Sequence, residues 1–96
     1  MAATTVVDVP PVSYHAAQRW DQRTAPDSVA PETAWEHGQR VASARAFRAT
    51  EVRYHRPTGA LLLYKPPAIT TTLTVEEMTD RQYHAVEHAL PQEVRR

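Results

Sequence analysis

The pattern closest to a metal site is H-x-x-E-H, which occurs at His84, Glu87 and His88. Two histidines four residues apart on a helix can bind one zinc ion. A catalytic site of this kind needs a further carboxylate ligand downstream, and few residues follow His88. The apolar stripe of the C-terminal helix also places both histidines on the side that faces water. We therefore interpret the pattern as a solvated helix surface and expect no metal site.

Side chains suited to nucleophilic catalysis are scarce. The chain has no cysteine, none of its serines lies in a G-x-S-x-G turn, and its two glycines cannot form a phosphate-binding loop. Glu51 is expected to face Lys65 across a hairpin, and the acidic residues of the C-terminal helix are expected to face water. The sequence therefore predicts a protein that is not an enzyme and that binds no cofactor.

Basic residues gather in the middle of the chain, although its net charge is zero. Between residues 37 and 65 there is one acidic side chain, Glu51, against six basic ones: Arg40, Arg45, Arg48, Arg53, Arg56 and Lys65. Such a region can neutralise phosphates, but phosphate-binding domains are usually clearly basic overall. Nucleic-acid binding is therefore the second hypothesis rather than the first.

A β-hairpin over residues 51–65 would position many of these groups. Pro57 suits the first central position of a type I turn, and Gly59 supplies the positive φ of a bulged hairpin. If Arg56 lies opposite Ala60, one face carries Val52, Tyr54, Leu62 and Tyr64. The other face then carries Glu51, Arg53, His55, Leu61, Leu63 and Lys65.

In this register Leu61 and Leu63 share a face with Arg53 and His55, so something must cover the two leucines. Apolar side chains framed by arginine are typical of a protein interface. The alternative is that the first helix of the same chain covers them.

A third strand is expected over residues 69–73, where residues of high β-propensity alternate. Thr74 and Glu77 form a capping box, which predicts a helix from Val75 to Leu90, just before Pro91. Its expected apolar stripe comprises Val75, Met78, Thr79, Gln82, Tyr83, Val86, Ala89 and Leu90.

The N-terminal part is expected to contain an arm and a first helix. Pro31 suits the first turn of a helix over residues 31–46, whose stripe of small residues contains Arg45, a candidate for an ion pair across an interface. Residues 1–30 are expected to form an extended, proline-rich arm with a short helix capped by Ser13. Trp20 would anchor this arm, either on its own domain or in a partner.

These elements predict an α+β fold: an extended N-terminal arm, a helix, a three-stranded antiparallel sheet (hairpin plus one strand) and a C-terminal amphipathic helix. The arm is assigned to residues 1–30, a single small domain to 31–91 and a tail to 92–96. No secretory signal and no membrane-spanning run is found, so we expect no membrane contact and a protein that is cytoplasmic or part of an intracellularly assembled particle.

From Val52 onward, three short antiparallel strands precede a helix that starts with T-x-E-E. This order is similar to the small sheet-reading DNA-binding modules of the plant AP2 type and the integrase arm-binding type. The resemblance covers roughly 40 residues. It implies that Arg53, His55 and Lys65 reach into the major groove from an exposed sheet face.

We therefore predict a small non-enzymatic protein-interaction module: an adaptor, a small subunit or a component of a virion or complex. Its partner would be another protein or a second copy of the chain. The predicted partner-binding residues are Trp20, Arg45, Arg53, His55, Leu61 and Leu63. In the alternative, a basic three-stranded sheet binds nucleic acid through Arg48, Arg53, Arg56 and Lys65.

Overall fold

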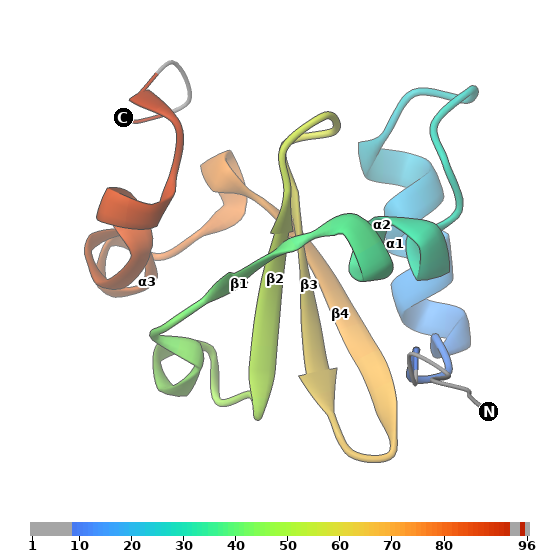
Figure 1. The fold of residues 1–96 in the computed structure, drawn as a ribbon, viewed down its shortest axis with the longest axis horizontal. Helices are drawn as coiled ribbons and strands as arrows, with labels where there is room; N and C mark the ends of the chain where they lie inside the picture. The colour runs from blue at the N-terminus through green and yellow to red at the C-terminus, as the bar shows by residue number, and fades with distance from the viewer. Residues whose placement is uncertain (1–8, 93–94, 96) are drawn as a thin grey trace, which may run out of the picture.

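Figure 1 shows the fold of the computed structural model, which describes residues 9–92 and 95. The helices are α1 (Tyr14–Arg23), α2 (Pro31–His37) and α3 (Asp80–Val86), and the 3-10 helices are η1 (Ala44–Phe47), η2 (Val75–Glu77) and η3 (Glu87–Ala89). The strands are β1 (Gln39–Val41), β2 (Glu51–His55), β3 (Ala60–Lys65) and β4 (Ala68–Thr74). They form one antiparallel sheet in the order β1-β2-β3-β4.

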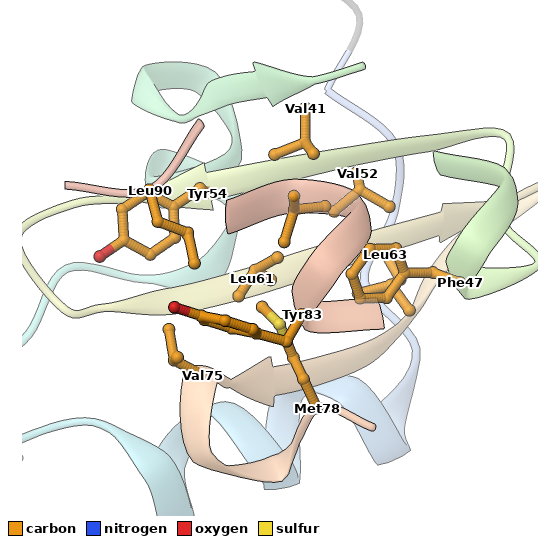
Figure 2. Close-up of a cluster of buried hydrophobic side chains, with 11 residues drawn as sticks. Val41, Phe47, Val52, Tyr54, Leu61, Leu63, Val75, Met78, Tyr83 and Leu90 are labelled. Carbon is orange, nitrogen blue, oxygen red and sulfur yellow. The ribbon is translucent and has the colours of Figure 1, made fainter. Parts of the chain in front are cut away.

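Helices cover both faces of this sheet (Figure 1). On one side, termed the α1–α2 face, Trp20 of α1 packs in a buried cluster with Leu62 of β3. On the opposite side, termed the α3 face, Leu61 and Leu63 lie between the sheet and Tyr83 of α3 (Figure 2). Successive side chains of a strand point to opposite faces, so β3 can supply leucines to both cores only because each face is covered.

The predicted α+β class with an antiparallel sheet is confirmed, but the sheet has four strands rather than three. The fourth strand exists because α2 ends at His37 instead of continuing to residue 46. Gly38 lies so close to the backbone that a Cβ there would stand 2.9 Å from the carbonyl oxygen of Ala34 and 3.1 Å from the Cβ of Arg53. This close approach lets the chain leave α2 directly as β1, which pairs with β2.

The predicted pairing of β2 with β3 is wrong by one residue. Ala60 lies opposite His55 rather than opposite the residue after it, so the hairpin loop comprises residues 56–59. Gly59 closes this loop with a φ of 73°, and its N–H donates to the carbonyl of His55 at 2.9 Å. Because side chains alternate along a strand, the shift by one residue places Leu61 and Leu63 on the face opposite to His55.

The single helix predicted from residue 75 to residue 90 is also wrong. The capping box of Thr74 and Glu77 forms as expected, but it caps only the short η2. The chain is extended at Met78, and a second capping box, formed by Thr79 and Gln82, starts α3. Five residues of the predicted apolar stripe are nevertheless buried: Val75, Met78, Tyr83, Val86 and Leu90.

Near the N-terminus, α1 begins at the cap that the sequence indicated. The Ser13 hydroxyl accepts a hydrogen bond from the N–H of Ala16 at 3.1 Å. The helix then continues to Arg23, and Trp20 is 2% exposed, so this side chain folds back onto its own chain. Residues 1–8 of the expected arm lie outside the described residues, and the division of the chain at residue 30 stays a prediction.

Candidate active site

Four polar side chains form a row across three neighbouring strands. The pairing places Arg40 of β1 opposite Arg53 of β2, and Glu51 of β2 opposite Tyr64 of β3. Residues 51 and 53 point to the same side of β2, because side chains two apart on a strand share a face. All four side chains therefore lie on the α1–α2 face. We term this set the charged row.

Arg53 is held in place by contacts with two residues. Its Nε donates to Oε2 of Glu51 at 2.6 Å, and its Nη1 donates to the carbonyl oxygen of Trp35 at 2.8 Å. Its guanidinium carbon also lies 4.5 Å from the centroid of the Trp35 ring, within the range of a cation–π interaction. Since Trp35 belongs to the last turn of α2, these contacts tie that helix to the sheet and fix the direction of the guanidinium group.

The Glu51–Arg53 pair remains accessible to a ligand. The side chains of Glu51 and Arg53 are 21% and 25% exposed. A partly shielded ion pair interacts more strongly than one in bulk water, because the local dielectric constant is lower. A phosphate that approached Arg53 from solvent would therefore meet a positioned cation beside a carboxylate.

Tyr64 adds a phenol group to the row. Its ring lies 6.0 Å from that of Trp35, which orients the side chain, and it is partly exposed. Within residues 9–92 and 95 its hydroxyl makes no hydrogen bond. A phenol hydroxyl can donate or accept one, so this group is free to contact a substrate.

The row's own Arg40 and the neighbouring Lys65 add positive charge at this part of the sheet. Arg40 is exposed and Lys65, which directly follows Tyr64, is partly exposed. Neither forms an ion pair with any residue that the structure describes. The carboxylate, the phenol and the two guanidinium groups of the row lie on one face and can together transfer protons and stabilise a negatively charged transition state. Lys65 points to the other face, because successive side chains of a strand alternate.

His55 and His37 form a second group of titratable side chains on the same face. Burial lowers the pKa of His55, and the charge of His37 lowers it further. The His55 Nδ1 lies 2.8 Å from the Thr58 hydroxyl oxygen, and the ring lies 5.9 Å from that of Trp20. Because His55 is only 6% exposed, it is much less accessible to a phosphate than the charged row.

The six predicted partner-binding residues are not brought together. Leu61 and Leu63 are 0% and 3% exposed beneath α3, and Trp20 is buried on the opposite face. Arg53 and His55 share that opposite face, whereas Arg45 is exposed on η1. The sheet face that the resemblance to DNA-binding modules required to be open is covered by α1 and α2.

The predicted nucleic-acid residues are also divided. Arg48, in the turn after η1, and Lys65, at the end of β3, lie at one end of the sheet. Arg56 lies in the hairpin loop at the other end, and Arg53 is engaged by Glu51.

The H-x-x-E-H pattern lies on an exposed surface, as its position in the sequence indicated. The side chains of His84 and His88 are 73% and 90% exposed. In the described part of the chain, no group of three or more histidine and acidic side chains is arranged to hold a metal ion. Among the same residues, no helix has the length and apolar character needed to cross a membrane.

Sequence reasoning missed the charged row because it used the wrong register. It paired Glu51 with Lys65 and placed Tyr64 on the other face of the hairpin. The predicted helix over residues 31–46 includes Arg40, which the structure places in the edge strand β1. A hairpin loop of four residues instead of three places Glu51, Arg53 and Tyr64 on one face.

The fold is a small α+β domain, and the charged row places a carboxylate, a phenol and two guanidinium groups on one face of its sheet. Residues 12–76, more than half of the chain, match the family model described as "Putative RelE superfamily toxin domain", and the chain belongs to this family. No curated protein and no solved structure matches the chain.

This membership corrects the functional predictions made from the sequence. Toxin domains of the RelE superfamily are ribonucleases, so the prediction that the chain is not an enzyme is wrong. The prediction of a non-enzymatic adaptor, small subunit or structural component is wrong for the same reason. The predicted small α+β domain agrees with the structure.

Proposed function

We propose that the chain is a toxin that cleaves RNA and that the charged row is its active site. The observation that supports this assignment best is the pairing of Glu51 with Tyr64 across β2 and β3, beside the positioned guanidinium of Arg53. All these residues lie within the segment that matches the toxin family. The row contains groups that can transfer protons and that a substrate can reach. His55 can also transfer protons, but it is buried.

In the proposed reaction, the Glu51 carboxylate takes the proton of a ribose 2′-hydroxyl, and the 2′-oxygen attacks the adjacent phosphorus. The bond between phosphorus and the 5′-oxygen breaks, and the Tyr64 hydroxyl donates its proton to that leaving oxygen. The products are a 2′,3′-cyclic phosphate and a 5′-hydroxyl end. Proton transfer from the substrate to Glu51 and from Tyr64 to the product balances the step.

Arg53 and Arg40 would stabilise the charge that develops on the phosphate oxygens. Arg53 is already oriented by Trp35, so little reorganisation is needed when a phosphate arrives. A phosphate would compete with Glu51 for this guanidinium, which would release the carboxylate to act as a base. Arg40, opposite Arg53, would contribute a second cation from the edge strand.

A protein partner is part of the proposal. Toxin domains of this kind typically pair with an antitoxin protein, so we expect the chain to bind a protein that blocks its activity. We also retain the sequence-based expectation that the chain acts in the cytoplasm, where its RNA substrate would be found.

The proposal is tested by inducing the chain in cells without a partner protein and following growth. Wild-type protein is expected to arrest growth, and Tyr64→Phe is expected to abolish the arrest, because it removes only the hydroxyl that protonates the leaving group. General acid catalysis contributes about 10²–10⁴-fold to the rate. No described hydrogen bond is lost in this variant, so its melting temperature should equal that of the wild type.

Tyr14→Phe is the matched control, since Tyr14 is 82% exposed and lies outside the charged row. It should arrest growth as the wild type does. Undiminished toxicity of Tyr64→Phe, at equal expression, would show that the active site lies elsewhere.

A further inference from the structure

Arg48 occupies an unfavourable backbone conformation. Its φ of 55° and ψ of 37° place it in the left-handed region, and it is the one non-glycine residue with positive φ among those described. It ends η1, and its N–H donates to the carbonyls of Ala44 and Arg45. Glycine is preferred at such a position because it has no Cβ to crowd the carbonyl oxygen, and asparagine is sometimes found there because its side chain can hydrogen-bond locally. The backbone geometry alone therefore does not explain an arginine here.

No hydrogen bond or ion pair between the Arg48 side chain and a described residue offsets this strain. The side chain is exposed, and within the described part of the chain it forms neither a hydrogen bond nor an ion pair. Arg45 on η1 and Lys65 at the end of β3 are likewise unpaired there. These three cations therefore remain available to an external anion.

Arg48 lies at the end of the sheet that carries Glu51 and Tyr64. It precedes Glu51 by three residues, and the N–H of Thr50 donates to the carbonyl of Tyr64 at 2.9 Å. The segment that carries Arg48 is thus hydrogen-bonded to the strand of the proposed general acid. In Figure 1, η1 and the end of β3 both lie toward the lower end of the sheet.

From these observations we propose that Arg48 binds a phosphate of the RNA substrate beyond the scissile one, and that this contact explains an arginine at a strained position. The inference rests on the proposed function and deepens it. Arg48 would be a positioning residue at the end of the sheet, three residues before Glu51 of the charged row. An RNA strand is favoured over an acidic protein segment because this basic end adjoins the proposed catalytic groups.

The test compares wild type, Arg48→Gly and Arg48→Lys in two measurements on the purified full chain. The first is binding to a fluorescent, fully 2′-O-methylated single-stranded RNA, which cannot be cleaved through its 2′-oxygen. Binding is titrated at salt concentrations between about 50 and 200 mM. The second is the melting temperature.

Arg48→Gly is expected to melt at a higher temperature than the wild type, because glycine relieves the strain. It is also expected to bind RNA about fivefold more weakly near 0.1 M salt. The slope of the logarithm of the binding constant against the logarithm of the salt concentration should be shallower by about 0.7, because one phosphate contact with a single strand is lost. Arg48→Lys should retain most of the affinity and show no gain in melting temperature. Arg81→Gln, which removes an exposed arginine from α3, should leave the affinity unchanged.

The possible failures are distinguishable. If the wild type binds RNA and Arg48→Gly binds equally well with the same slope, the role of Arg48 is refuted and the charged row is unaffected. If Arg48→Gly melts at a lower temperature, the arginine is structural and the inference also fails. If the wild type does not bind this RNA at low salt, this inference and the proposed function both fail.

Discussion

At the scale of single residues, the surroundings of His55 determine its protonation. The side chain is 6% exposed, and one ring nitrogen lies 2.8 Å from the Thr58 hydroxyl oxygen. Burial disfavours the charged imidazolium, and the nearby His37 adds a second unfavourable charge, so the pKa of His55 lies below its ordinary value. The folded protein therefore holds His55 in its neutral form across a wider pH range than the unfolded chain does.

This difference makes the stability of the fold depend on pH. Above the ordinary histidine pKa of about 6.5 both states are neutral at His55, and its contribution to stability is complete. As the pH falls below that value, the unfolded chain binds a proton before the folded chain does, so stability is lost. We expect the melting temperature to fall between about pH 7 and pH 5, and less steeply in His55→Gln.

His37→Gln serves as the control for the effect of the His37 charge on the pKa of His55. It removes the neighbouring charge but leaves His55 buried, so most of the pH dependence should persist. An equally steep loss of stability in His55→Gln would show that other groups cause the acid sensitivity.

At the scale of secondary-structure elements, the junction between α2 and β1 positions the charged row. Gly38 allows the helix end to approach β2 closely, and Arg53 then reaches the carbonyl of Trp35. The φ of Gly38 is −73°, which any residue can adopt, so the requirement for glycine here is spatial. Both nearest atoms belong to the backbone or to a Cβ and cannot move aside cheaply.

Gly38→Ala is therefore expected to destabilise the fold by about 1–3 kcal/mol, as overpacking commonly does. It should also reduce growth arrest, because displacing α2 moves the carbonyl that orients Arg53. Chemical denaturation measures the stability, and the growth assay measures the activity.

Gly59 provides a contrast within the same fold. Its φ is 73°, and a Cβ there would meet no atom closer than 4.0 Å, so backbone conformation rather than space selects glycine. Asparagine tolerates this conformation, so Gly59→Asn should lower the free energy of unfolding by less than Gly59→Ala does. At Gly38 asparagine should be no better than alanine, and a benefit of asparagine there would contradict the steric explanation.

At the scale of the whole molecule, stability depends on two buried clusters, one on each side of a single sheet. Leu61 and Leu63 belong to the cluster under α3, within the core of the chain itself (Figure 2). The double substitution Leu61→Asp and Leu63→Asp should unfold the protein, because each charge would be buried without a partner. Circular dichroism should show loss of structure, whereas Val29→Asp, at a side chain that is 44% exposed, should remain folded. A folded double variant would show that the α3 cluster is dispensable.

The fold could be predicted from the sequence wherever a local signal was decisive. The cap at Ser13, the strand of alternating residues around Thr72 and the capping box at Thr74 all occur where expected. The local signals gave the wrong structure where two possible hairpin loops differ in length by one residue. A loop of three or four residues fits the Pro57–Gly59 turn, and a one-residue change exchanges the two faces of the hairpin.

The candidate site could not be predicted because it depends on that register and on contacts distant in sequence. Arg40, Glu51 and Tyr64 become neighbours only after β1 and β3 pair on either side of β2. The charge counts indicated a basic middle region, and Arg45 and Arg48 of this region are exposed. The charge counts did not indicate which basic side chains form ion pairs within the fold, such as Arg53 with Glu51.

The most direct test is to map new RNA 5′ ends in cells shortly after induction of the chain. The wild type should produce new 5′-hydroxyl ends within RNA, as attack by the 2′-oxygen requires, and Tyr64→Phe at equal expression should produce none above background. Absence of new 5′-hydroxyl ends with the wild type, or the same ends with Tyr64→Phe, would contradict cleavage by the charged row.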